Sequence, residues 1–138
     1  MSIYLIRHAS ASTRGILGHG NDLDRELDAV GHDQAAAIAQ SLADVGITEI
    51  FTSRAARCRQ TVEPLGKQLG VDVIEHDGLL EGQSATAAVH LLRTLAQAGT
   101  TAALCSHGDI IPDAIQTLAR EGMVITCLLY TSPSPRDS

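Results

Sequence analysis

The chain is poor in aromatic residues and in cysteine, and it has no long apolar run. Aromatic side chains make up 2% of its 138 residues and tryptophan is absent, so the core must be aliphatic. Cys58, Cys105 and Cys127 are an odd number without CxxC spacing, which indicates neither a disulfide framework nor a zinc knuckle. The opening MSIYLI lacks the basic start and the length of a secretory signal, and no later stretch approaches a membrane span. We expect a soluble, cytoplasmic protein without a membrane partner.

Positive charge is also scarce. The 10 lysines and arginines are outnumbered by 16 aspartates and glutamates, which gives a formal net charge of −6. A surface that binds nucleic acid must be basic to displace counterions from phosphates, so the composition argues against a nucleic-acid partner. Any attraction for phosphate must be local. The length and the 44% hydrophobic content suit one globular domain with its own core.

The composition changes abruptly at Cys127, where the string CLLYTSPSPRDS begins. This string is similar to the in-frame translation of a transposase-type sequencing adapter, and a natural disordered Ser/Pro tail is the alternative. We expect residues 1–126 to form the domain and residues 127–138 to be a non-native tail outside the fold. The domain would then be truncated at its C-terminus, with its last strand missing.

Apolar runs and helical periodicities alternate along the remaining chain. We predict strands at residues 2–6, 48–52, 71–75 and 101–105, and helices at residues 28–45, 54–69, 85–98 and 110–120. A long polar loop between residues 9 and 27 separates the first strand from the first helix, and loops of this length are usually functional. The alternation predicts an α/β fold, a three-layer α/β/α sandwich with a mostly parallel sheet.

Polar clusters follow the predicted strands. They are Arg7-His8, the segment from Ser53 to Thr61 with Arg57 inside it, Glu81, and Ser106-His107-Gly108. Ligands bind in the crevice beyond the carboxyl ends of the strands of an open α/β sheet, so we expect these clusters to meet in one pocket. Two arginines, two histidines and one carboxylate suit phosphoryl transfer through a histidine nucleophile.

Three arginines lie in the first turns of the predicted helix at residues 54–69. Cations there oppose the helix dipole unless an anion is bound. We assign Arg57 to the pocket and expect Arg54 and Arg59 to form a solvated basic face. The remaining histidines show no spacing typical of a metal site, so we predict no metal and no cofactor.

Three motifs in this order resemble the histidine phosphatase superfamily, also called the phosphoglycerate mutase-like family. IYLIRHASA is similar to the family's strand and Arg-His-Gly signature, with Ala9 in place of glycine. SRAARCRQT is similar to Ser-Pro-x-x-Arg-x-x-Gln-Thr, with Arg54 in place of proline, and CSHGDIIP resembles the second histidine motif. The resemblance covers residues 3 to about 120 and is strongest to a small bacterial branch. That branch includes phosphohistidine phosphatases and the phosphatase domain of some Nudix hydrolases.

The resemblance implies a phosphoglycerate mutase-like fold and assigns roles to the clustered residues. His8 would be the nucleophile that forms a phosphohistidine, and Arg7, Arg57 and His107 would complete the phosphate pocket, with His107 also catalytic. Glu81 would protonate the leaving oxygen and then help to activate water. The replacement at Ala9 would matter only if the backbone there needed a positive φ.

Several assignments stay open at this stage. Glu75 and Asp77 are rivals of Glu81 for the acid. Arg14, or the pair Asp24-Arg25, could contact the substrate or order the long loop. The resemblance implies a phosphatase that acts on a phosphorylated small molecule or a phosphohistidine protein. A mutase would need more substrate-holding surface than this chain has, and a non-catalytic phosphate-binding module or an inactive fragment are the alternatives. The oligomeric state is not indicated.

Overall fold

The computed structural model describes residues 3–11, 25–80, 85–107, 110–120 and 126–129. Its centre is a parallel sheet with the strand order β3-β2-β4-β1-β5. The strands are β1 (Ile3–Arg7), β2 (Glu49–Thr52), β3 (Val73–Glu75), β4 (Ala102–Ser106) and β5 (Thr126–Leu129). The predicted α/β class and parallel sheet are confirmed.

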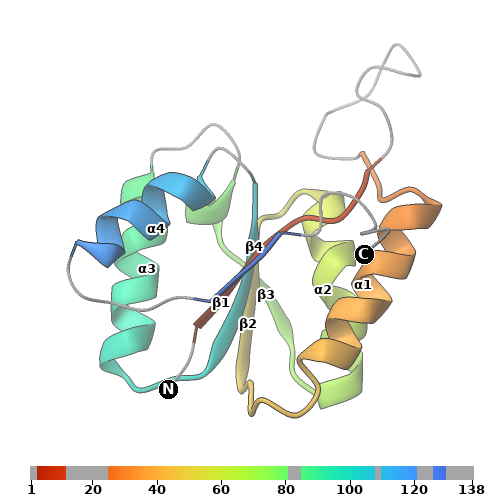
Figure 1. The fold of residues 1–138 in the computed structure, drawn as a ribbon, viewed down its shortest axis with the longest axis horizontal. Coiled ribbons are helices and arrows are strands. Elements are labelled where there is room, and N and C mark those ends of the chain that lie inside the picture. The colour runs from red at the N-terminus through yellow and green to blue at the C-terminus, as the bar shows by residue number, and fades with distance from the viewer. Residues whose placement is uncertain (1–2, 12–24, 81–84, 108–109, 121–125, 130–138) are drawn as a thin grey trace.

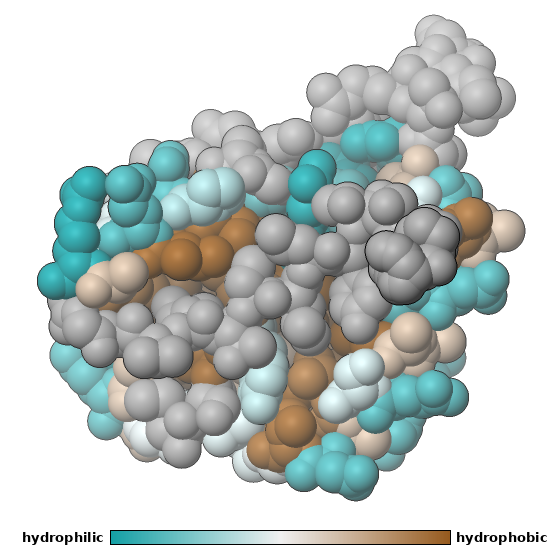
Figure 2. Space-filling view, viewed as in Figure 1, coloured by the Kyte–Doolittle hydropathy of each residue, from teal (hydrophilic) through white to brown (hydrophobic). Residues whose placement is uncertain are grey.

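Two helical layers cover the two faces of the sheet (Figure 1). One layer consists of α1 (Ala29–Ser41) and α2 (Ala56–Leu69), which pack against each other. The other consists of α3 (Ala85–Gln97) and α4 (Ile111–Ala119), with the short 3-10 helix η2 (Asp77–Leu79) packed against α3. In the same view, Figure 2 shows polar residues on the outer sides of both layers and apolar residues between them.

Side chains of β1 alternate between the two layers because successive residues of a strand point to opposite faces. Ile3 and Leu5 join the apolar cluster under α3 and α4, whereas Ile6 joins the cluster under α1 and α2. The inner strand β4 is buried along its whole length. The buried hydrophobic residues are aliphatic or cysteine, as the shortage of aromatic residues predicts.

Local signals set the ends of the helices. The Asp28 side chain accepts a hydrogen bond from the Gly31 amide and caps α1. Gly70 ends α2 with a left-handed φ of 69°. The first helix was predicted to reach Val45, but α1 ends at Ser41 and its C-cap is Leu42. Helical spacing of apolar residues therefore continues past the last helical turn.

The strand β5 differs from the sequence expectation for the tail. It lies beside β1, with Tyr4 opposite Thr126 and Arg7 opposite Leu129. Its last three residues, Cys127 to Leu129, belong to the segment that the sequence analysis left out of the fold. A short apolar run can form an edge strand even when a Ser/Pro-rich string follows it. The change in composition at Cys127 therefore does not mark the end of the fold. The origin of that string stays a prediction.

Within the described ranges, none of the helices has the length and apolar character needed to cross a bilayer.

Candidate active site

The carboxyl ends of β1, β2 and β4 bring the polar clusters together. Arg7 is opposite Ser106 in the parallel register, and the amide of His8 donates to the Ser106 carbonyl oxygen at 3.1 Å. The amide of Ser53 donates to the Cys105 carbonyl oxygen at 3.0 Å. These backbone bonds extend the sheet by one residue beyond each strand, so the side chains that follow share one crevice.

The His8 ring is held in one tautomer. Its Nδ1 lies 2.8 Å from the carbonyl oxygen of Ala9, and because a carbonyl can only accept, Nδ1 carries the proton and Nε2 keeps its lone pair. Burial lowers the pKa of His8 to about 4. Coulombic interactions with Arg57, His107 and Arg7 act in the same direction, and the Ala9 hydrogen bond acts in the other. The imidazole is therefore neutral at neutral pH.

His107 faces His8 and is fixed by its own contacts. The two ring centroids are 5.5 Å apart in an edge arrangement. Nδ1 of His107 lies 3.4 Å from Nη2 of Arg57, and Nε2 lies 2.9 Å from Oγ of Ser53. Because a guanidinium can only donate, Nδ1 accepts, and the Nε2 proton is donated to the Ser53 hydroxyl.

Arg57 is a fully buried arginine in the first turn of α2. The helix starts at Ala56 without a side-chain cap and without an acidic residue in its first turn, so the positive end of its dipole is not offset there. A buried guanidinium costs several kcal/mol unless it is paired and hydrogen-bonded. Together these features form a site suited to an anion.

Thr61 connects α2 to the segment that contains His8 and Ala9. Its hydroxyl accepts from the Ala9 amide at 3.0 Å and donates to the Arg57 carbonyl oxygen at 2.6 Å. Ala9 is buried, and no non-glycine residue of the described ranges has a positive φ. Alanine therefore replaces the family's glycine without backbone strain.

Three residues that the sequence did not single out, Ser53, Gln60 and Gln34, hold parts of the site in place. Ser53 orients His107, and the Gln60 side chain bonds to the Leu27 amide at 2.9 Å and to Glu26 at 3.2 Å. The buried Gln34 accepts from the Ser10 amide at 2.8 Å. Ser53 and Gln60 lie within the recognised motif, which was the available signal, whereas nothing in the sequence marked Gln34.

The rivals for the acid are engaged elsewhere. Glu75 lies 3.2 Å from Arg59, and Asp77 lies 3.8 Å from Arg54. Both carboxylates are at least half exposed, which is consistent with a solvated basic face for the two arginines. Arg14, Asp24, Glu81 and Gly108 lie outside the described residues.

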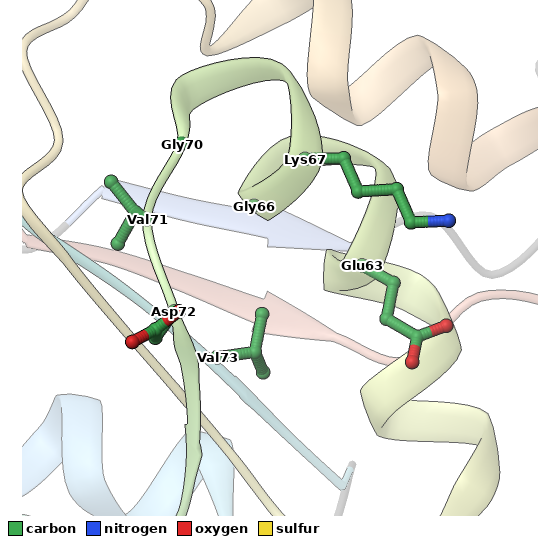
Figure 3. A pocket seen from close by; sticks show the side chains of 7 residues that line it. All are labelled: Glu63, Gly66, Lys67, Gly70, Val71, Asp72 and Val73. Carbon is green, nitrogen blue, oxygen red and sulfur yellow. The ribbon is translucent and has the colours of Figure 1, made fainter.

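A cavity of about 180 Å³ opens beside His8. Its lining residues are Arg7, His8, Ala9, Ser10, Ala11 and Arg25. A larger groove of about 360 Å³ lies at the other end of α2, where Figure 3 shows the Lys67 and Glu63 side chains and the turn through Gly70. None of the described residues that line that groove is a histidine or an arginine. Nowhere in the described ranges do three or more His, Cys, Asp or Glu side chains gather as metal ligands would.

The family model of the histidine phosphatase superfamily (branch 1) matches residues 3–88, more than half of the chain. The chain belongs to this superfamily. The match spans β1, α1, β2 and α2, which supply His8 and Arg57.

Solved structures of this superfamily share the fold. SixA of Agrobacterium tumefaciens, assigned as a phosphohistidine phosphatase, has a TM-score of 0.73 and 27% identity, covering 87% of this chain and 77% of that one. The protein histidine phosphatase SixA complexed with tungstate also has a TM-score of 0.73, with 22% identity over 83% of this chain and 74% of that one. The second likeness concerns the fold alone.

Among curated proteins, the 8-oxo-(d)GTP phosphatase of Mycolicibacterium smegmatis is 32% identical over 121 residues. The alignment covers 83% of this chain but 36% of that protein. The chain spans about a third of the length of the curated relatives that it matches.

Proposed function

We propose that the chain is a phosphatase that hydrolyses a phosphate monoester or a phosphohistidine through a covalent phosphohistidine on His8. The main support for this proposal is the tautomer and the protonation state of His8. Its Nδ1 proton is engaged by the Ala9 oxygen at 2.8 Å and its pKa is lowered to about 4, so Nε2 offers a lone pair at neutral pH. The superfamily match, the names of the mycobacterial phosphatase and of SixA, and a tungstate oxyanion held by a related fold support phosphoryl chemistry.

The first step forms a nitrogen–phosphorus bond. Nε2 of His8 attacks phosphorus while the bond from phosphorus to the leaving atom breaks. The leaving atom is an oxygen in a phosphate monoester and a ring nitrogen in a phosphohistidine, and it departs with the electron pair and takes a proton. In the second step water attacks phosphorus, the nitrogen–phosphorus bond breaks, and its electron pair returns to Nε2. The products are inorganic phosphate and the regenerated imidazole.

Glu81 is the proposed proton donor and, in the second step, the acceptor of the proton from water. The loop just before it is tied to the site, because Ser106 Oγ donates to the Leu79 carbonyl oxygen at 2.6 Å. Leu79 and Leu80 are buried next to this bond. This anchoring supports Glu81 over Glu75 and Asp77, whose carboxylates pair with surface arginines.

Positive donors stabilise the transferring phosphoryl group. Arg57 is buried against His107, and Arg7 lines the cavity beside His8. Phosphoryl transfer depends mainly on positioning and on charge neutralisation. Loss of one such preorganised donor costs about 2.7–4 kcal/mol of transition-state stabilisation. The proposed substrates are phosphorylated small molecules or phosphohistidine proteins, and the proposed compartment is the cytoplasm.

Trapping the intermediate tests the proposal. The folded chain is incubated with a ³²P-labelled phosphate ester, quenched, and examined for protein-bound label that is lost in acid and kept in alkali. His8→Ala should abolish this label, whereas His90→Ala on the exposed side of α3 should keep it. A folded wild-type chain without label, or label that survives in His8→Ala, would reject the mechanism. The first of these results favours a phosphate-binding module or an inactive fragment.

A further inference from the structure

The cavity beside His8 is lined by only part of the proposed phosphate pocket. Arg7 and His8 line it, but Arg57 and His107 do not. Its volume of about 180 Å³ equals the space of roughly six waters at about 30 Å³ each. A phosphoryl group on His8 would therefore leave part of the cavity for the rest of the substrate.

Among the described residues that line the cavity, the two arginines Arg7 and Arg25 are the charged ones, and none is a carboxylate. Arg25 is half-buried. A guanidinium presents a planar fork that matches phosphate and carboxylate oxygens. The part of the cavity beside Arg25 therefore suits a second anionic group better than a neutral sugar or an apolar group.

Arg25 is held in place by the backbone that follows it. Leu27 forms a bridge with Ala11, and the Asp28 amide donates to the Ser10 carbonyl oxygen at 3.1 Å. From α2, Gln60 accepts from the Leu27 amide at 2.9 Å and donates to Glu26 at 3.2 Å. The segment that begins at Arg25 is thus fixed to both the nucleophile segment and α2.

We propose that this cavity is a leaving-group subsite for a second anionic group, phosphate or carboxylate, and that Arg25 is the residue that selects for it. Gln60 is a positioning residue that acts through Glu26 and Leu27. The inference rests on the proposed function and narrows its substrate class to phosphorylated molecules that carry another anion near the scissile bond.

Binding of unreactive probes tests the subsite without turnover. Methylphosphonate has one anionic head and methylenediphosphonate has two, and neither carries a hydrolysable P–O–P or ester bond. Their dissociation constants are measured by calorimetry on wild type, Arg25→Ala, Arg25→Lys and Arg120→Ala. Arg120 lies exposed at the end of α4, so its removal controls for the loss of one positive charge.

We expect Arg25→Ala to weaken methylenediphosphonate binding by about tenfold or more, because a charge-assisted contact is lost, and methylphosphonate binding by less than about threefold. Arg25→Lys should restore part of the difference, and Arg120→Ala should change neither constant. Gln60→Ala should lower the diphosphonate affinity alone, by a smaller factor. Equal effects of Arg25→Ala on both probes, or none on either, would overturn the inference.

Phosphonoacetate carries one phosphonate and one carboxylate. It tests whether the subsite accepts a carboxylate as well as a phosphate. Binding that depends on Arg25 for both two-headed probes identifies a general anion subsite, and dependence for methylenediphosphonate alone restricts it to phosphate. The phosphohistidine assay on the same Arg25→Ala protein keeps the two proposals apart. Label on His8 without Arg25-dependent selectivity would reject the subsite and retain the phosphatase.

Discussion

The α1–α2 layer and the α3–α4 layer cover opposite faces of one sheet, but they bury different kinds of side chain. The cluster under α3 and α4 is apolar throughout, with Leu92, Leu104 and Leu118 fully buried. The buried polar residues in helices, Gln34, Arg57 and Thr61, all belong to α1 and α2. Within the described ranges, both layers bury an apolar cluster against the sheet, and the α1–α2 layer also buries polar helix residues close to the site.

This difference has an energetic meaning. Apolar burial contributes about 25 cal/mol per Å² of surface removed from water. A buried guanidinium such as Arg57 instead carries a desolvation penalty that hydrogen bonds or opposite charges must offset. Both layers therefore contribute apolar burial, and only the α1–α2 layer also buries a charged helix residue within the described ranges. Mutations on the two sides should therefore separate stability from activity.

Loss of His8, the proposed nucleophile, should have the largest effect. His8→Ala is expected to reduce turnover of a phosphate ester by at least about 10⁴-fold, because the covalent route is removed. His90→Ala, an exposed histidine of α3, should retain full activity. Steady-state rates at equal folded concentration measure both. Activity of His8→Ala within about tenfold of wild type would remove His8 from this role.

Arg57→Ala should lower kcat/KM by about 10²- to 10³-fold, since one preorganised donor to the phosphoryl oxygens is lost. Inhibition by inorganic phosphate and by vanadate should weaken in parallel. Arg59 is the matched control, because it lies two residues further along α2 and pairs with Glu75 at 3.2 Å on the surface. Phosphate inhibition that is unchanged in Arg57→Ala would place the anion elsewhere.

Leu92→Ala tests the apolar layer. The Leu92 side chain is fully buried in the α3–α4 cluster, so truncation should lower the free energy of unfolding by about 2–5 kcal/mol. Urea unfolding followed by circular dichroism measures the loss. The kcat/KM of the molecules that remain folded should stay within about twofold of wild type. A selective loss of activity without a loss of stability would contradict the separation of the layers.

Gly31→Ala tests how closely α1 approaches the backbone of Ser10, two residues after His8. A β-carbon at Gly31 would overlap the backbone oxygen of Ser10, so α1 or the segment at Ser10 must move. Overpacking of this kind typically costs about 1–3 kcal/mol, and we expect kcat/KM to fall along with the melting temperature. An alanine variant with wild-type activity and stability would show that the contact is not needed.

The smallest of these effects should appear in the titration of His8, as a pKa below the ordinary value for histidine. NMR of the ring protons should place the pKa of His8 near 4, compared with 6.5 for an unperturbed histidine. Between these two pH values the unfolded chain binds a proton that the folded chain does not, so the contribution of His8 to stability falls as pH drops from about 6.5 to about 4. Above that window the contribution is constant. A midpoint near 6.5 would mean that the ring is not desolvated.

Much of the site could be predicted because Arg7, His8 and His107 lie at or directly after the carboxyl ends of β1 and β4. Arg7, His8 and His107 needed only the strand ends and the rule for open α/β sheets, and the structure brings them together with Arg57. Their catalytic roles stay predictions. The fold class followed from the alternation of strands and helices in the same way.

The remaining contacts could not be predicted because they depend on how α1 and α2 cross the ends of the strands. Thr61, Gln60 and Gln34 act through bonds to backbone groups that are 24 to 52 residues away in sequence. No periodicity encodes such pairs. The edge strand β5 was missed for another reason, because its four residues precede a Ser/Pro-rich string that dominated the local composition.

The atom that carries the phosphoryl group is the most direct test of this account. The chain is phosphorylated, quenched in alkali and examined by ³¹P and ¹⁵N NMR, which distinguish the two ring nitrogens of a phosphohistidine. Because Nδ1 of His8 is held by the Ala9 oxygen at 2.8 Å, the account predicts a single phosphohistidine linked through Nε2 of His8. Phosphate on Nδ1 of His8, on His107, or on the Cys58 sulfur that lies 3.6 Å from Nε2 of His107 would contradict it.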